Sequence, residues 1–213
     1  MTTALTSLLS PVSDHRVHRL VEELGRLGHD IRFLDAPWDE RLRAARAGEV
    51  AGTWVCGLLH VELGSGGGWL YSAVAAPASP RPGTGGAAVY FGDVVVNHDA
   101  PHRTFEDLQG STFAYNEEAS LSGYRMMVDH LRSIGTDLEY FGATRRSGSH
   151  RASLDMVLSG EADCATIDST IVDEGIDGLD RVRTVHSIGP YPAPPLVVAP
   201  EWRDPMATAA SAA

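Results

Sequence analysis

The chain has 213 residues, 43% of them hydrophobic and 21% charged, which is enough for one large or two small domains with a proper core. It carries 28 Asp and Glu against 17 basic residues, all of them Arg, for a formal net charge of −11. The absence of lysine excludes Schiff-base chemistry and a P-loop lysine, and no basic stripe indicates nucleic-acid binding. No apolar run approaches the roughly 18 residues of a membrane span, so no transmembrane helix is predicted.

The two cysteines, Cys56 and Cys164, have no partner at the short spacing of a thiolate metal site. Both lie in apolar runs, which favours buried free thiols, with a single long-range disulfide as the alternative. The N-terminus lacks the basic region and the long apolar stretch of a signal peptide. We therefore expect a cytoplasmic protein as written, or a periplasmic or extracellular one if an export signal has been removed.

The first hundred residues alternate strand and helix patterns. Behind a capping pair, Ser13 and Asp14, apolar residues recur at helical spacing until Gly28. Strand, helix, strand, helix and strand in this order predict a parallel sheet with helical crossovers. The glycine- and proline-rich segments 64–68 and 77–86 are expected to be loops. The predicted strands cover residues 3–9, 29–34, 52–61 and 69–75, and the predicted helices cover 14–27 and 37–47.

A second alternation follows the strongly β-forming run 89–97. Thr104 and Asp107 resemble a capping box over a short helix, and Gly135 and Gly160 end two longer helices. Further strands are predicted over 111–115, 140–143, 162–168 and 181–186, and helices over 121–134 and 149–158, whereas 190–200 is too rich in proline for regular structure. Extended segments near 90–98 and 180–188 would join two lobes around a cleft, with lobe I formed by residues 1–95 plus 183–213 and lobe II by 98–180.

Two predicted helix starts carry the best candidate binding residues. The segment 120–124 (Ser-Leu-Ser-Gly-Tyr) follows a strand directly, and the segment 147–150 (Ser-Gly-Ser-His) opens the next helix. A helix N-terminus has unpaired N–H groups and a partial positive charge, so it suits a phosphate-like or carboxylate anion, to which serine hydroxyls add donors. Plain helix capping by serine explains either segment alone better than a binding site does, but the occurrence of two such segments in one lobe leaves both interpretations open.

Other constellations are weaker. His15, His18 and Glu22 share one helix face, and His98 and His102 flank a proline turn, but a solvated polar surface explains both sets better than a metal site. A glycine-rich segment beginning at Gly64 lacks the third glycine of the dinucleotide fingerprint.

Six segments nevertheless occur in the order seen in one family. They are 54–58, 90–96, 104–110, 120–124, 147–150 and 160–169. In these segments the chain resembles the phosphate/phosphite/phosphonate-binding proteins of ABC transporters, over roughly residues 50–200. The resemblance implies an α/β, type 2 periplasmic-binding-protein fold, with mixed sheets flanked by helices and a cleft at a two-segment hinge. It also implies a small anionic ligand, and an ABC permease as partner if the protein is exported. We expect no cofactor and no metal.

The resemblance also implies which residues meet the ligand. Ser120, Ser122, Gly123 and Tyr124 would contact the anion at one helix start, Ser149 and His150 would close on it from the next helix, Asp168 would lie at the cleft rim and Tyr90 on the hinge strand. The chain is several tens of residues shorter than usual members, so two alternatives stay open. One is a cytoplasmic lyase or isomerase on the same fold with His150 as general base, because the pKa of histidine lies near working pH. The other is a shortened relative that no longer closes.

Overall fold

The computed structural model describes residues 3–212 and divides the chain into two compact units, each built on a five-stranded sheet. Unit 1 takes the described part of Met1–Ala78 and of Ala193–Ala213, and unit 2 is Ser79–Pro192. The limits expected near 95 and 183 fall inside two long strands, β5 (Val89–Asn97) and β9 (Val182–Pro192). These strands pair with each other in the sheet of unit 2, which moves the unit boundaries outward along the chain.

The sheet of unit 1 has the strand order β2-β1-β3-β10-β4. Its first three strands are parallel, as the alternating pattern predicts, and β10 pairs antiparallel with both neighbours. The apolar face of α1, with Val17, Leu20 and Leu24, is fully buried in the core of this unit. Its elements are β1 (Thr3–Ser7), η1 (Pro11–Ser13), α1 (Asp14–Arg26), β2 (Ile31–Phe33), α2 (Trp38–Arg46), β3 (Gly52–Trp54), α3 (Gly57–Ser65), β4 (Ser72–Ala75), β10 (Leu196–Val198), η6 (Pro200–Trp202) and α7 (Arg203–Ala212).

Three of the elements expected from the sequence are wrong. The run 52–61 is a strand only as far as Trp54 and then becomes helix α3, because a short apolar run fits a buried helix as well as a strand. The proline-rich segment 190–200 contains the end of β9 and all of β10. Since β9 is an edge strand, the N–H groups missing from its prolines cost no hydrogen bond to a further strand. The expected extended segment 140–143 is the end of a short helix followed by β7.

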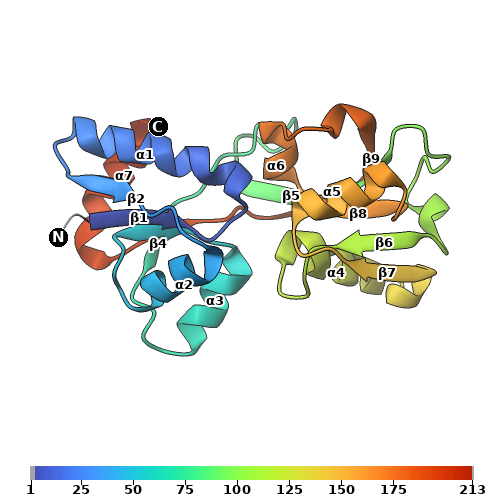
Figure 1. The fold of residues 1–213 in the computed structure, drawn as a ribbon, viewed down its shortest axis with the longest axis horizontal. Coiled ribbons are helices and arrows are strands. Elements are labelled where there is room, and N and C mark those ends of the chain that lie inside the picture. Colours follow the sequence, from blue (N-terminus) through green and yellow to red (C-terminus); the bar gives the residue numbers. More distant parts are fainter. Residues whose placement is uncertain (1–2, 213) are drawn as a thin grey trace. The chain divides into compact units, whose positions relative to one another are not determined.

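Unit 2 has the strand order β7-β6-β8-β5-β9, in which β7, β6 and β8 are parallel and β5 is antiparallel to both of its neighbours (Figure 1). Its elements, apart from β5 and β9, are η2 (Glu106–Leu108), β6 (Thr112–Tyr115), η3 (Leu121–Arg125), α4 (Met126–Ser133), η4 (Leu138–Tyr140), β7 (Ala143–Arg146), α5 (His150–Ser159), β8 (Cys164–Asp168), α6 (Ser169–Glu174) and η5 (Leu179–Arg181).

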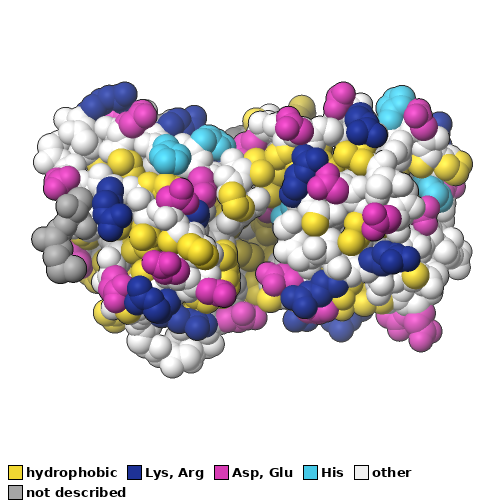
Figure 2. All heavy atoms as spheres, in the orientation of Figure 1, with side chains coloured by type: hydrophobic (Ala, Val, Ile, Leu, Met, Phe, Trp, Pro, Cys, Tyr) yellow, Lys and Arg dark blue, Asp and Glu magenta, His cyan; other side chains and the backbone are white. Residues whose placement is uncertain are grey.

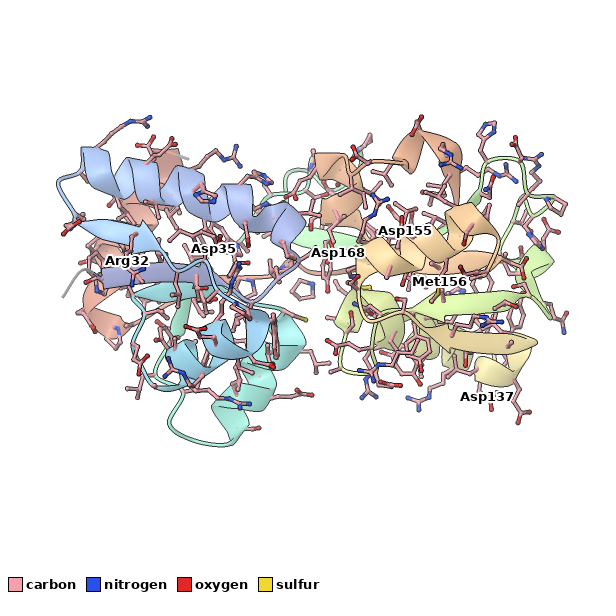
Figure 3. The ribbon with its side chains drawn as sticks, viewed as in Figure 1. Arg32, Asp35, Asp137, Asp155, Met156 and Asp168 are labelled. Carbon is pink, nitrogen blue, oxygen red and sulfur yellow. The ribbon has the colours of Figure 1, made fainter. Side chains whose placement is uncertain are left out.

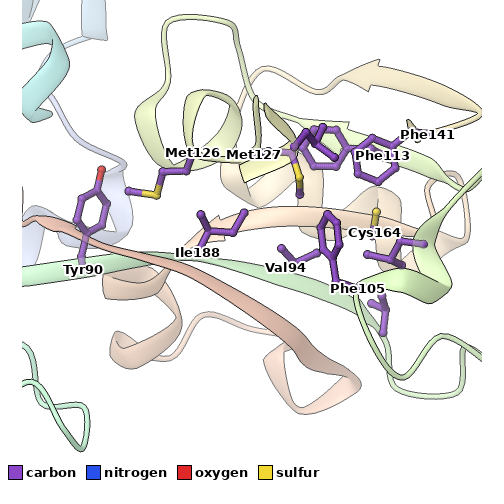
Figure 4. Close-up of a cluster of buried hydrophobic side chains, with 12 residues drawn as sticks. Tyr90, Val94, Phe105, Phe113, Met126, Met127, Phe141, Cys164 and Ile188 are labelled. Atoms are coloured by element: carbon purple, nitrogen blue, oxygen red, sulfur yellow. The ribbon is translucent and has the colours of Figure 1, made fainter. Parts of the chain in front are cut away.

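A hydrophobic cluster fills the space between this sheet and α4 (Figure 4). Phe113, Met127 and Leu131 are completely buried in it, and Cys164 contributes its thiol side. Helix α5 contributes Leu154 and Val157 to the core but none to this cluster, consistent with its place on the other face of the sheet.

The parallel strands bring three loops of unit 2 to one sheet edge. Strand β6 leads into the continuous helical segment η3–α4, β7 leads into α5, and β8 leads into α6. Because the carboxyl ends of parallel strands lie at the same edge, the starts of these three helical segments are neighbours, and ligands of open α/β sheets bind at such edges.

Three surface and side-chain properties can be compared with what the composition predicts. Arg side chains are interspersed with Asp and Glu on the visible face of each unit, without a basic stripe (Figure 2). Within residues 3–212, no helix is long and apolar enough to cross a membrane. Within the described residues, neither Cys56 nor Cys164 forms a disulfide; Cys164 is buried, which raises the pKa of its thiol to about 12, and Cys56 is half-buried.

Candidate functional site

Three side chains from the three helix starts meet at this edge of unit 2. The Ser122 Oγ lies 3.3 Å from the His150 Nε2 and 3.2 Å from the Asp168 Oδ2. Ser122 comes from η3, His150 from the first turn of α5, and Asp168 from the end of β8, where Figure 3 labels it. Ser122 and His150 are buried and Asp168 is half-buried. The fold therefore joins residues that are 28 and 46 positions apart in the chain.

Burial governs the charge state of His150. Desolvation lowers the pKa of His150 below its ordinary value, although the Asp168 carboxylate and the backbone of Thr166 act in the opposite direction. The ring is consequently neutral at pH 7. Because the Ser122 hydroxyl donates its proton to Asp168, the Ser122 oxygen is an acceptor for a proton on the His150 Nε2.

The order of these contacts bears on catalysis. In a nucleophilic Ser–His–Asp relay the histidine lies between serine and carboxylate, with one ring nitrogen facing each. Here Ser122 lies between His150 and Asp168, and its hydroxyl donates to the carboxylate directly. This arrangement holds three polar side chains together at the sheet edge, and it lacks the serine–histidine–carboxylate order that activates a serine nucleophile.

Ser120 caps the neighbouring helical segment. Its Oγ accepts hydrogen bonds from the Gly123 N–H at 3.1 Å and from the Asn116 Nδ2 at 2.9 Å. The backbone of Ser120 also accepts from the Arg125 N–H, which widens the first turn of the segment into a π-helical turn. Capping is thus a real role of Ser120, in addition to any contact with a ligand.

Two glycines allow this turn to approach its surroundings. A Cβ on Gly123 would lie 1.9 Å from the Asn116 Oδ1, and a Cβ on Gly92 would lie 2.8 Å from the Thr166 Cγ2 and 3.2 Å from the Ser122 carbonyl oxygen. A side chain at Gly92 would therefore push the turn away from the sheet, and a side chain at Gly123 would displace the Asn116 amide or the turn. Gly92 pairs with Asp168 across β5 and β8, so it lies directly beneath the site.

The other residues implied by the resemblance have different surroundings. The ring of Tyr124 packs on the ring of Tyr115, with centroids 4.8 Å apart. The guanidinium carbon of Arg125 lies over the Tyr124 ring, 5.7 Å from its centroid. Ser149 is exposed and caps α5 by accepting a hydrogen bond from the Ala152 N–H. Tyr90 belongs to the buried cluster of Figure 4, two residues before Gly92. Ligand contact by Tyr124, Ser149 and Tyr90 stays a prediction.

Sequence reasoning did not find three residues that shape the site. Asn116 and Gly92 are those just described, and Thr170 holds Asp168 by donating both its N–H and its hydroxyl to Oδ1, at 2.8 and 2.7 Å. An Asp followed two positions later by Thr at a helix start was the available signal for the last of these. Asn116 carries no such signal, because its backbone contact with Gly148 depends on how the fold brings a distant segment next to it.

Among residues 3–212, no group of three or more His, Cys, Asp and Glu side chains is arranged to hold a metal ion. In the weak His15, His18 and Glu22 set on α1, the His18 ring packs edge-on against Phe33 at 4.8 Å. The donors at the sheet edge of unit 2 are hydroxyls, N–H groups and one imidazole, a set that suits an oxyanion.

Comparison with solved structures identifies the fold. A binding protein component of an ABC phosphonate transporter from Pseudomonas aeruginosa matches with a TM-score of 0.72 at 16% identity, covering 99% of this chain and 72% of that one. PhnD1 from Prochlorococcus marinus (MIT 9301), in complex with methylphosphonate, gives 0.73 at 16%, covering 99% and 80%. The periplasmic aliphatic sulphonate binding protein SsuA from Escherichia coli gives 0.63 at 15%, covering 98% and 68%. The fold is that of the two-lobed periplasmic binding proteins, as the resemblance implied.

The family follows from the sequence itself. Residues 11–212 match the family model described as ABC transporter, phosphonate, periplasmic substrate-binding protein, and the chain belongs to this family. No protein of curated function shows significant sequence similarity to it.

Proposed function

We propose that the chain binds a phosphonate or a related phosphate-like oxyanion at the sheet edge of unit 2, and that it does so as the substrate-binding component of a transporter. The meeting of Ser122, His150 and Asp168 beside the start of the η3–α4 segment is the observation that carries this proposal. Membership of the phosphonate-binding family supports it, and so does the methylphosphonate held by a solved structure of the same fold.

Short-range donors would supply the affinity. The protein has no lysine and a net charge of −11, so its overall field repels an anion. The first turn of a helix offers unpaired N–H groups and a partial positive charge, worth about 0.3–1 kcal/mol for an anion. Hydroxyl donors add charge-assisted hydrogen bonds of about 1.5–3 kcal/mol each. Ser120 is the hydroxyl at this turn that would make such a bond, because the Ser122 hydroxyl donates its proton to Asp168.

Asp168 would select the type of oxyanion. A carboxylate inside an anion site repels a ligand that has only acceptor oxygens, whereas an oxyanion that carries a proton can donate that proton to it. A phosphonate or phosphate monoanion has such a P–OH group at neutral pH, and a sulfonate or sulfate has none. The Asp168 Oδ1 is occupied by Thr170 and Oδ2 by Ser122, which fixes the carboxylate for this role.

The transport role is proposed from the family. We infer that the chain works in the periplasm or outside the cell and delivers its ligand to an ABC permease, as the family description implies. In that role the ligand leaves chemically unchanged.

A matched pair of ligands tests the proposal. Methylphosphonate and methanesulfonate have nearly the same size and shape and differ in the protonatable oxygen. Calorimetric titration at pH 7 should show one-site binding of methylphosphonate and at least about tenfold weaker binding of methanesulfonate, the loss of one charge-assisted hydrogen bond. Binding of neither methylphosphonate nor phosphite nor phosphate would refute the proposed function, and equal binding of the matched pair would refute the role of Asp168.

The enzyme alternative has its own readout. Phosphorus NMR of methylphosphonate kept with the protein should show an unchanged ligand. Conversion that disappears in His150→Ala would establish catalysis with His150 as the base.

A further inference from the structure

Asn116 lies where the turn that opens the η3–α4 segment meets the turn that leads into α5. It directly follows β6 and is buried, with 9% of its surface exposed. Its backbone carbonyl accepts the Gly148 N–H at 2.9 Å, in the loop that leads to His150. Its side chain reaches the other turn, at Ser120. One residue therefore fixes the spacing of both helix starts.

The contacts of Asn116 determine which way its amide points. The Glu117 N–H donates to the Asn116 Oδ1 at 2.9 Å, and an N–H can only face the amide oxygen. The Nδ2 is thereby turned toward the Ser120 Oγ, 2.9 Å away, and must act as the donor. A flipped amide would place two N–H groups face to face.

This orientation decides the role of the Ser120 hydroxyl. A serine oxygen has two lone pairs and one proton. Here both lone pairs accept, one from the Asn116 Nδ2 and one from the Gly123 N–H. The proton of Ser120 has no acceptor among residues 3–212, so it is left to donate to a group outside the protein. An oxyanion is such a group.

We propose that Asn116 is a positioning residue that makes Ser120 an obligatory donor to the bound oxyanion. The inference rests on the proposed function and deepens it, because it assigns the anion contact to one hydroxyl. The direction of that hydroxyl's proton is set by the two donors that occupy the Ser120 oxygen. Asn116 does not touch the ligand itself. Glycine at position 123 leaves the room that this amide needs, since a Cβ there would lie 1.9 Å from Oδ1.

Asn116→Asp is the informative substitution. It keeps the size of the side chain and the acceptor for the Glu117 N–H, but it replaces the donor that faces Ser120 by an acceptor. The Ser120 proton would then turn inward to the new carboxylate and be lost to the ligand. With methylphosphonate as the probe, we expect at least about tenfold weaker binding at pH 7.5.

A double-substitution cycle with Ser120→Ala separates this effect from charge repulsion. The new carboxylate would repel an anion whether or not Ser120 is present, whereas proton redirection needs the hydroxyl. We therefore expect Asn116→Asp to weaken binding by less than about threefold in the Ser120→Ala background. Equal losses in the two backgrounds would overturn the proposal, and so would an unchanged affinity of the single variant.

The pH profile gives a readout that a purely structural role would not move. As the new carboxyl protonates, toward about pH 4–5, it regains a proton to donate to Ser120, so the affinity ratio between the unsubstituted protein and Asn116→Asp should fall toward one. A ratio independent of pH would contradict the proposal. If Asn116→Asp does not melt cooperatively, Asn116→Ala takes its place in the cycle, with an expected loss of about three- to tenfold that also vanishes in the Ser120→Ala background. Failure of the unsubstituted protein to bind methylphosphonate, phosphite and phosphate would instead refute the proposed function, and this inference with it.

Discussion

Ser122→Ala removes a buried hydroxyl that is 5% exposed and that joins His150 to Asp168 at 3.3 and 3.2 Å. Two consequences follow from these contacts. The folded protein loses a hydrogen bond to a carboxylate and leaves His150 without its partner, which costs about 1–3 kcal/mol of stability. The site also loses the group that orients both side chains around the ligand, so binding should weaken by about 1.5–3 kcal/mol, or roughly 10- to 150-fold.

Calorimetric titration with methylphosphonate and a thermal melt on the same sample measure both effects. Ser111→Ala is a matched control, because Ser111 is also buried in unit 2 but lies before β6, at the opposite end of that strand, where its Oγ contacts the Cys164 Sγ at 3.8 Å. The control should lower the melting temperature without changing the dissociation constant. The same outcome for Ser122→Ala, a lowered melting temperature beside an unaltered dissociation constant, would reduce Ser122 to a structural residue and refute the reasoning.

Three further predictions follow from other contacts in unit 2. Gly123→Ala places a Cβ 1.9 Å from the Asn116 Oδ1, so either the turn or the Asn116 amide must shift. We expect a loss of about 1–3 kcal/mol of stability by chemical denaturation and at least about tenfold in affinity, and a normal affinity would contradict the ligand contact proposed for this turn. Arg81→Met removes the bidentate ion pair, at 2.8 and 2.5 Å, from the carboxylate of Asp93, a residue that is only 1% exposed. Urea unfolding should show that the free energy of unfolding falls by about 3–5 kcal/mol, and a fall of less than about 1 kcal/mol would contradict the pairing. Because burial lowers the pKa of His150, the folded state binds fewer protons than the unfolded state, and stability should fall as the pH drops below 6.5, the ordinary pKa of histidine. Between pH 7 and pH 5, His150→Gln should lose less stability than the unsubstituted protein, and an equal loss would contradict this account.

The alternation of strands and helices was readable from the sequence because amphipathic periodicity and capping residues are local signals. The helix begun at Asp14 and the strand Val89–Asn97 were predicted nearly to the residue. Helix α3 was not, since an apolar run of a few residues carries no period that separates a helix from a strand. The outer end of β9 was missed for another reason: its prolines are tolerated because β9 is an edge strand, which only the strand order reveals. Strand β10 contains no proline, but the prolines on both sides of it hid its short apolar run.

The candidate site likewise has a part that local sequence signals predict and a part that only the fold creates. Ser120, Ser122 and Gly123 stand together in one segment, and the signature of a helix start was sufficient to single them out. The contacts that join Ser122 to His150 and Asp168 depend on three strands ending at one edge, which no local pattern encodes. The role of Asn116 was hidden for the same reason, because its carbonyl and its amide serve two segments that the fold, and not the sequence, makes neighbours.

The central claim is that the oxyanion binds at this edge of unit 2, and amide chemical shifts of the isotope-labelled protein during titration with methylphosphonate test it most directly. Residues at the three helix starts, 120–125, 149–152 and 168–170, should shift together and saturate at a single dissociation constant. Saturable shifts confined to other parts of the chain, or no shifts at all, would contradict the account.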